Sequence, residues 1–216
     1  MQKMTKNNKI EYIEKFLEGI RDICNTVSQE TIDQITEIFF QAWLRHNTIF
    51  FIGNGGSAGT AMHFSADISN AAAEFENLPQ IKSQSLVENI VRYSALVNDR
   101  GWNNVYLEQL KNYFSPGDIV VAISVHGGSG KDKAEPWSQN LTAALQYAKD
   151  NGGKTVGLAG FDGGAFKDIC DLCLVVPYNT TPHVEAFHVV IHHLIFDELK
   201  KRITKAAQSF DTNEKK

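Results

Sequence analysis

The chain lacks two features that would point to a membrane or a nucleic acid. None of its apolar runs reaches the about eighteen residues that cross a bilayer, and residues 1–16 are charged, without the apolar segment of a signal peptide. With 21 Lys and Arg against 25 Asp and Glu, its formal net charge is −4, so there is no basic excess to hold a phosphate backbone. We therefore expect a cytoplasmic protein that binds neither membrane nor nucleic acid.

Cysteine is also scarce, because the 216 residues contain three: Cys24, Cys170 and Cys173. An odd number in a chain of this size is typical of a reducing compartment and not of a disulfide framework. Cys170 and Cys173 form a CxxC pattern, but they lie in the segment DICDLCLVVP, which is typical of a buried strand. A redox pair would normally open a helix, where the thiolate is stabilised. We expect these two thiols to serve packing.

What the chain does have is an alternation of short apolar runs and helical patterns. The predicted strands are 48–53, 82–86, 118–124, 154–160 and 172–177. The predicted helices between and after them are 57–70, 87–97, 133–151 and 183–203. This order predicts an α/β fold with a parallel sheet covered by helices on both faces. Two amphipathic helix patterns in 9–46 either cover the sheet or pair with another subunit, and the tail from about Ala206 is expected to be disordered.

Two glycine-rich segments follow predicted strands. GNGGS (53–57) ends the first strand and SVHGGSG (124–130) ends the third. Neither is a Rossmann or a Walker A motif, because the spacing and the lysine do not fit. Glycines nevertheless let a backbone approach an anion, and a helix start offers free N–H groups. Because ligands bind beyond the carboxyl ends of parallel strands, the two segments predict a phosphate site.

Close to the first segment, His63 and Asp67 lie four residues apart and hence on one face of a predicted helix. An isolated pair of this kind would be a polar core contact and a solvated carboxylate. Beside a phosphate segment, the pair indicates half of a metal or acid–base site.

The last predicted helix offers several partners for that pair. At about 100° per residue, Glu185 and His192 lie roughly 20° apart around the helix, whereas Glu185 and His193 lie about 80° apart. Helical geometry alone favours His192, or the step of three from Glu185 to His188 that metal carboxylate sites use. The residues alone do not choose between these histidines.

Five segments in order resemble one family, the phosphoheptose isomerases of the SIS (sugar isomerase) class, over about 48–200. The segments that carry the resemblance are GNGGSAGTAMHF (53–64), VNDRGW (97–102), ISVHGGSG (123–130), GLAGFDGG (157–164) and VEAFHVVIHHLI (184–195). The resemblance implies a three-layer SIS fold, a five-stranded parallel sheet flanked by helices with an N-terminal helical pair, assembled as a homotetramer. It implies a single SIS domain over 1–216, with helices in 1–47, a sugar-phosphate-binding core in 48–203 and a tail in 204–216.

The same resemblance implies an aldose–ketose isomerase that converts sedoheptulose 7-phosphate to D-glycero-heptose 7-phosphate, often with zinc. The implied substrate-binding residues are Asn54, Gly55, Gly56, Ser57, Asp99, Ser124, His126 and Ser129, with the serines on the phosphate. The implied ligands of Zn²⁺, or of another divalent metal, are His63, Asp67, Glu185 and His193. The implied catalytic residues are Asp67, Glu185 and His193, with one carboxylate as the base and the imidazole as the acid. The resemblance thus selects His193, and His192 remains the alternative.

The sequence departs from the family pattern in and around this site. Asp67 stands where the family has glutamate, which draws the carboxylate back by about 1.5 Å, and a misplacement of that order can cost about 100-fold in rate. Glu185 replaces the usual glutamine and adds a negative charge. His126 replaces a serine, Pro182 replaces an aspartate, and the segment 130–140 is longer than in the family.

These departures leave three hypotheses. The first is a metal-dependent phosphosugar isomerase, and the third is an isomerase for a different phosphosugar or an enzyme that acts on a nucleotide-activated sugar. The second is a non-catalytic SIS protein that binds a sugar phosphate or associates with the bacterial replication initiator. Such a protein needs no acid–base groups, so the presence of His63, Asp67, Glu185 and His193 favours an enzyme.

Overall fold

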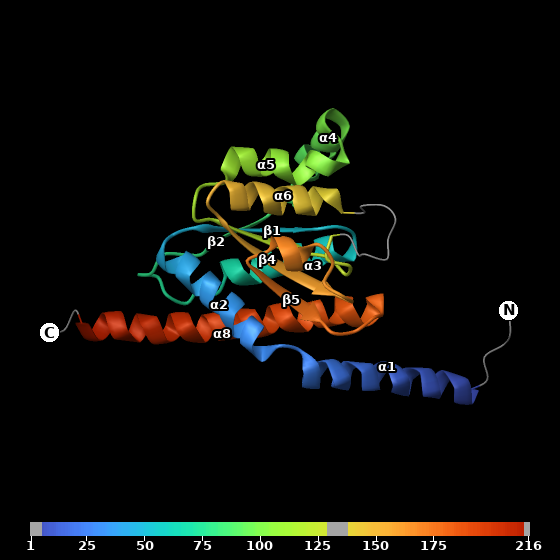
Figure 1. Ribbon diagram of the computed structural model, residues 1–216. Coiled ribbons are helices and arrows are strands. Elements are labelled where there is room, and N and C mark those ends of the chain that lie inside the picture. Colours follow the sequence, from blue (N-terminus) through green and yellow to red (C-terminus); the bar gives the residue numbers. More distant parts are fainter. Residues whose placement is uncertain (1–5, 129–137, 214–216) are drawn as a thin grey trace.

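A computed structural model describes residues 6–128 and 138–213, and five parallel strands form the middle layer of the fold (Figure 1). The strands are β1 (Thr48–Gly53), β2 (Lys82–Ser85), β3 (Ile119–Ile123), β4 (Lys154–Gly160) and β5 (Leu172–Val176). Their order in the sheet is β2-β1-β3-β4-β5, and every neighbouring pair is parallel. The predicted five-stranded parallel sheet is therefore confirmed.

Helices cover both faces of the sheet and complete a three-layer arrangement (Figure 1). The helices in the described residues are α1 (Lys6–Thr26), α2 (Gln29–Leu44), α3 (Gly56–Ser69), α4 (Ile90–Arg100), the 3₁₀-helix η1 (Trp102–Asn104), α5 (Val105–Tyr113), α6 (Gln139–Asp150), α7 (Phe166–Ile169) and α8 (Thr181–Asn213). Helices α2, α3 and α8 pack on one face, and α5, α6 and α7 pack on the other. The chain therefore has the α/β class that its alternating pattern predicts.

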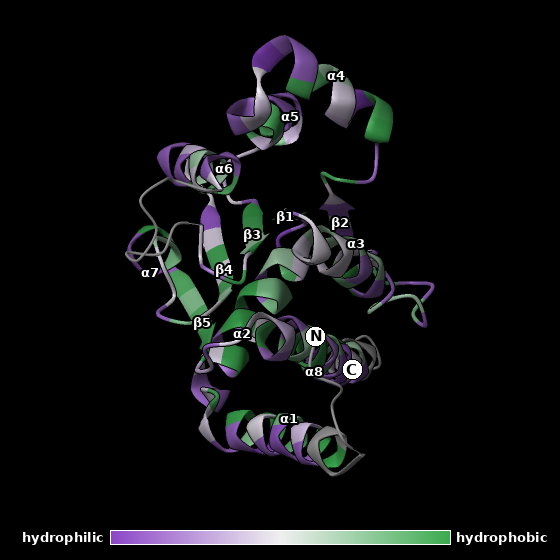
Figure 2. Cartoon of the chain, turned by 90° about the vertical axis from the view of Figure 1, so that its right-hand side faces the viewer, coloured by the Kyte–Doolittle hydropathy of each residue, from purple (hydrophilic) through white to green (hydrophobic). Residues whose placement is uncertain are grey.

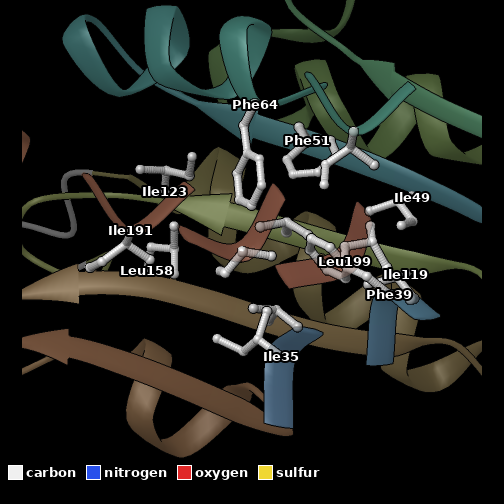
Figure 3. Close-up of a cluster of buried hydrophobic side chains, with 14 of the residues drawn as sticks. Ile35, Phe39, Ile49, Phe51, Phe64, Ile119, Ile123, Leu158, Ile191 and Leu199 are labelled. Atoms are coloured by element: carbon white, nitrogen blue, oxygen red, sulfur yellow. The ribbon is translucent and has the colours of Figure 1, made fainter. Parts of the chain in front are cut away.

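The central strands are buried on both faces, which explains their unbroken apolar runs. In β1, Ile49 and Phe51 contribute to the core under α2, α3 and α8, whereas Phe50 and Ile52 contribute to the core under α5 and α6. Figure 3 shows Phe51 beside Phe64 of α3, and their ring centroids lie 4.7 Å apart. Full burial of such a side chain stabilises the fold by about 1.5–3 kcal/mol, so this packing fixes α3 firmly on the sheet.

The two N-terminal helices behave differently. Helix α2 begins at the N-cap Ser28, whose hydroxyl accepts from the amide of Thr31, and it buries Ile35 and Phe39 against the sheet. Helix α1 lies along α8, apart from the sheet (Figure 2), and its side chains Ile13 and Leu17 are 56 % and 48 % exposed. One helix of the pair thus covers the sheet, and the other offers an apolar face with no covering element among the described residues.

The C-terminal part corrects one expectation. The tail from about Ala206 was expected to be disordered, but α8 continues to Asn213. The physical reason is that Ile203 is buried and Ala206 packs against the core beside α2, so the helix gains tertiary contacts beyond its predicted end. The sequence interpretation also missed α5, which lies between the predicted elements.

The CxxC segment fits the packing interpretation. Cys170 and Cys173 are free thiols at and just before β5, packed against the core under α5 and α6. Burial raises the pKa of Cys173 to about 11, and it raises that of Cys170 further. Both thiols therefore stay protonated at neutral pH, as expected for packing groups.

Among the described residues, no helix combines the length and the apolar character that crossing a bilayer requires.

Candidate active site

The strand order places the two glycine segments at one point of the sheet. From β1 the chain goes to β2 on one side and later to β3 on the other, so the order reverses between β1 and β3. In parallel α/β sheets, ligands bind beyond the carboxyl ends of the strands at such a switch point. Gly53 at the end of β1 pairs with Ile123 at the end of β3, so GNGGS and SVHGGSG leave the sheet side by side.

The first segment leaves an open helix start. Gly55 has a φ of +55°, which favours glycine, and a Cβ there would meet no atom within 4 Å. As N-cap of α3 it provides no side-chain cap, and Ser57 lies buried in the first turn. Uncapped N–H groups with a hydroxyl beside them suit a phosphate.

The second segment is braced by the loop after β4. A Cβ on Gly127 would lie 1.9 Å from the carbonyl oxygen of Gly163, so only glycine fits at this contact. The hydroxyl of Ser124 accepts from the amide of Gly128 at 3.2 Å, and the ring of His126 lies 4.2 Å from that of Phe161. Ser129 lies outside the described residues, so its predicted phosphate contact stays a prediction.

Two predicted sugar contacts are engaged differently from what the sequence suggested. The amide of Asn54 makes two hydrogen bonds with the buried Asn140, donating at 3.0 Å and accepting at 2.8 Å. This pair of hydrogen bonds joins the first glycine segment to α6. Asp99 lies exposed near the end of α4, where its carboxylate accepts from Asn98 at 2.8 Å. Their roles toward the sugar stay predictions.

Two to three turns beyond the first glycine segment, α3 meets α8 in a cluster of three imidazoles and one carboxylate. Oδ2 of Asp67 lies 3.1 Å from Nε2 of His192, 3.3 Å from Nδ1 of His193 and 3.5 Å from Nε2 of His63. One nitrogen or oxygen atom from each of the four residues lies within 4.8 Å of all the others. The structure thus brings together the predicted His63, Asp67 and His193, and it includes the alternative His192.

The cluster has a buried side and an open side. His192 is fully buried and stacks on Phe64, whereas the side chains of His63 and His193 are 50 % and 52 % exposed. Burial lowers the pKa of His192 to about 4, and the neighbouring His193 and His63 lower it as well. His192 is therefore neutral at pH 7.

The two remaining candidates on α8 lie outside the cluster. Nε2 of His188 donates to the carbonyl oxygen of Ala159, 3.1 Å away, and burial lowers the pKa of His188 to about 4. His188 is therefore a buried residue that ties α8 to β4, away from the cluster.

Glu185 lies apart from the cluster, and its predicted role as a metal ligand stays a prediction. Its carboxylate lies against Gly56, where an added Cβ would be 2.8 Å from Oε1, and it does not belong to the metal-ligating group of the described residues. Eight residues separate the backbone positions of Glu185 and His193 by about 12 Å along the helix axis. The carboxylate faces the glycine segment instead.

The residues of the cluster fit a divalent metal ion. Imidazole nitrogens and a carboxylate oxygen are the donors that zinc prefers, and a four-coordinate ion needs its donors within a few ångströms of one another. The cluster meets both conditions. His63, Asp67 and His193 could hold such an ion from the open side of the cluster.

Comparison with known proteins agrees with this architecture. A family model described as SIS domain matches residues 11–160. The chain belongs to the SIS domain family. The resemblance expected from the sequence is thereby confirmed.

Relatives of this SIS protein include phosphoheptose isomerases. The one from Aliarcobacter butzleri is 35 % identical over 187 residues, covering 85 % of this chain and 92 % of that protein. The lincomycin biosynthesis protein LmbN from Streptomyces lincolnensis is 37 % identical over 163 residues, which cover 74 % of this chain but 58 % of that longer protein. The structure of a phosphoheptose isomerase from Francisella tularensis matches with a TM-score of 0.79 at 24 % identity, covering 92 % of this chain and all of that one. The isomerase class and the SIS fold follow from these relatives.

Proposed function

We propose that this SIS protein is an aldose–ketose isomerase that converts sedoheptulose 7-phosphate to D-glycero-heptose 7-phosphate. The observation that carries the proposal is that one helix, α3, begins at the open glycine segment and bears His63 and Asp67 further along. Ser57 and His63 lie about 9 Å apart along the helix axis. This separation is comparable with the length of an extended seven-carbon sugar, whose phosphate and carbonyl lie at opposite ends.

The phosphate is bound by the two glycine segments. Uncapped amides at the start of α3 donate to its oxygens, and the hydroxyls of Ser57 and Ser124 add donors. Ser129 is the third serine in this proposal. The carboxylate of Glu185, which lies against Gly56, then faces the hydroxyl groups of the sugar next to the phosphate.

Proton transfer takes place at the cluster. Asp67 removes a proton from C1 of the ketose, which gives an enediolate, and His193 returns a proton at C2. Nδ1 of His193 faces Asp67, so its Nε2 is the atom available to the substrate on the open side. Zinc held by His63, Asp67 and His193 would supply positive charge close to the two reacting oxygens.

The proposal includes assembly as a homotetramer. Ile10, Tyr12, Ile13 and Leu17 of α1 are between 48 % and 64 % exposed. A groove of about 450 Å³ lies between the α1–α2 region and α8, lined in part by Val190 and Leu194. An apolar helix face next to an apolar groove suits a second copy of the same chain.

The test measures turnover and metal content together. The zinc-loaded protein is expected to isomerise sedoheptulose 7-phosphate, and His193→Ala is expected to abolish turnover while the ketose still binds. His63→Ala is expected to lose the zinc that elemental analysis finds in the wild type. If the wild type, with metal supplied, turns over no heptose or hexose phosphate but binds one, the non-catalytic hypothesis replaces this proposal.

A further inference from the structure

The fourth member of the cluster, His192, differs from the other two histidines in its surroundings. Its ring is fully buried and lies against Phe64, with ring centroids 5.2 Å apart and planes inclined by 25°. Three imidazoles surround Asp67, and among them only that of His192 has the distance and angles of a hydrogen bond to the carboxylate. Its Nε2 lies 3.1 Å from Oδ2. His192 therefore reaches the carboxylate from the buried interior, whereas His63 and His193 lie on its solvent-exposed side.

The position of the ring proton follows from the two ring nitrogens. Nδ1 of His192 is buried and has no hydrogen-bond partner among the described residues. A proton on Nδ1 would leave a buried N–H unpaired and would turn the Nε2 lone pair toward the carboxylate oxygen, and both are unfavourable. The proton therefore lies on Nε2, which donates to Asp67. A nitrogen that carries a proton has no lone pair for a metal ion.

We propose that His192 is a positioning residue: its Nε2–H holds Oδ2 of Asp67 from inside the fold, so that the carboxylate stays beside the exposed His63 and His193. This inference rests on the proposed function only for its effect on turnover. An aspartate carboxylate without this bond can rotate about two side-chain bonds away from both imidazoles. Outer partners of this kind orient a ligand without touching the ion, and their loss typically costs about 10- to 100-fold in metal affinity or activity.

The variants that test the inference separate a donor from a ligand. His192→Gln places an amide N–H close to where Nε2–H lies, whereas His192→Phe keeps a flat ring against Phe64 without any donor. His63→Ala is the reference for loss of a ligand. His188→Gln is the control for stability, because His188 is a buried histidine one turn earlier on α8 that bonds to a backbone carbonyl outside the cluster.

Three measurements give the outcome. Nitrogen-15 NMR of the metal-free wild type is expected to show His192 with a proton on Nε2 and none on Nδ1. Calorimetry with Zn²⁺ alone is expected to show His192→Gln close to the wild type, His192→Phe weaker by about 10- to 100-fold, and His63→Ala weaker still. With sedoheptulose 7-phosphate, His192→Phe is expected to lower kcat with little change in KM, and His192→Gln to restore kcat.

The inference is overturned if His192→Gln loses zinc as completely as His63→Ala, since His192 would then be a ligand. It is also overturned if NMR places the proton on Nδ1, or if His192→Phe binds zinc like the wild type. Absence of turnover in the wild type would refute the proposed function. The NMR and zinc measurements would still decide the role of His192.

Discussion

A substitution at Gly56 tests whether Glu185 works in the site. An added Cβ at this position would lie 2.8 Å from Oε1 of Glu185 and 3.2 Å from its Cδ, so the carboxylate must move by at least about 0.6 Å to reach an ordinary contact of 3.4 Å. Because the clash falls on the far end of a flexible side chain, Gly56→Ala is expected to fold normally. Since a misplacement of about 1 Å can cost about 100-fold, we expect kcat/KM to fall by about tenfold.

The matched control for Gly56→Ala is three residues further along α3. Gly59 is an exposed helical glycine, and a Cβ there would meet no atom within 4 Å. Gly59→Ala is therefore expected to raise the free energy of unfolding by about 0.5–1 kcal/mol, because alanine loses less backbone entropy on folding. It should leave kcat/KM unchanged. A thermal melt and a coupled isomerase assay measure both effects.

A double-mutant cycle separates the effect on Glu185 from any effect on the phosphate contacts of the loop. If Gly56→Ala acts by displacing Glu185, it should cost little more in a Glu185→Ala background, because the group it displaces is gone. Full additivity of the two losses would show that the alanine disturbs the phosphate site itself. An unchanged kcat/KM in Gly56→Ala would refute the reasoning that places Glu185 beside the substrate.

Three further outcomes are expected. Burial holds the pKa of His188 at about 4, so below about pH 6.5 this residue takes up a proton in the unfolded chain and not in the folded one. Its contribution to the free energy of unfolding should fall by about 1.6 kcal/mol between pH 6.5 and 5, so a His188→Leu variant, followed by urea titration at each pH, should lose that much less than the wild type. Cys170 and Cys173, whose thiol pKa values are raised by burial, should react with a thiol reagent at pH 8 only after unfolding, and reaction in the native state would contradict their packing role. Charges on the exposed face of α1, as in Ile13→Glu with Leu17→Glu, should dissociate the assembly by light scattering without unfolding the subunit, and an unchanged mass would show that this face is not the interface.

The fold was predictable where burial alone decides the pattern. The runs 48–53 and 154–160 match β1 and β4 to the residue, because both strands are buried on both faces and end at glycines. Helix α5 was missed because its buried positions, including Tyr106 and Leu110, sit in a segment of nine residues, too short for a helical period to stand out. The extent of α8 was missed because its last turns depend on tertiary packing, which no local pattern records.

The site was predictable in its parts and not in its pairings. The serines, glycines and histidines are visible as motifs, but the double hydrogen bond between Asn54 and Asn140 joins residues 86 positions apart. The contact between His126 and Phe161 likewise depends on how two loops meet. A local motif says which groups reach one end of the sheet, whereas the fold decides which of them stay available to a ligand.

The choice among the α8 residues shows where helical-wheel reasoning stops. Around the helix, Glu185 and His192 lie only about 20° apart, which suggests one shared ion, but seven residues also separate them by about 10 Å along the axis. Each therefore meets a different part of α3: Glu185 reaches Gly56 at its start, and His192 reaches Asp67 three turns later. Because α3 and α8 pack side by side, the proposed function uses one face of α8 for both ends of the sugar, with a carboxylate at the phosphate end and imidazoles at the carbonyl end. Agreement in angle around a helix therefore does not place two side chains at one ion, because the distance along the axis decides which part of the neighbouring helix each one meets.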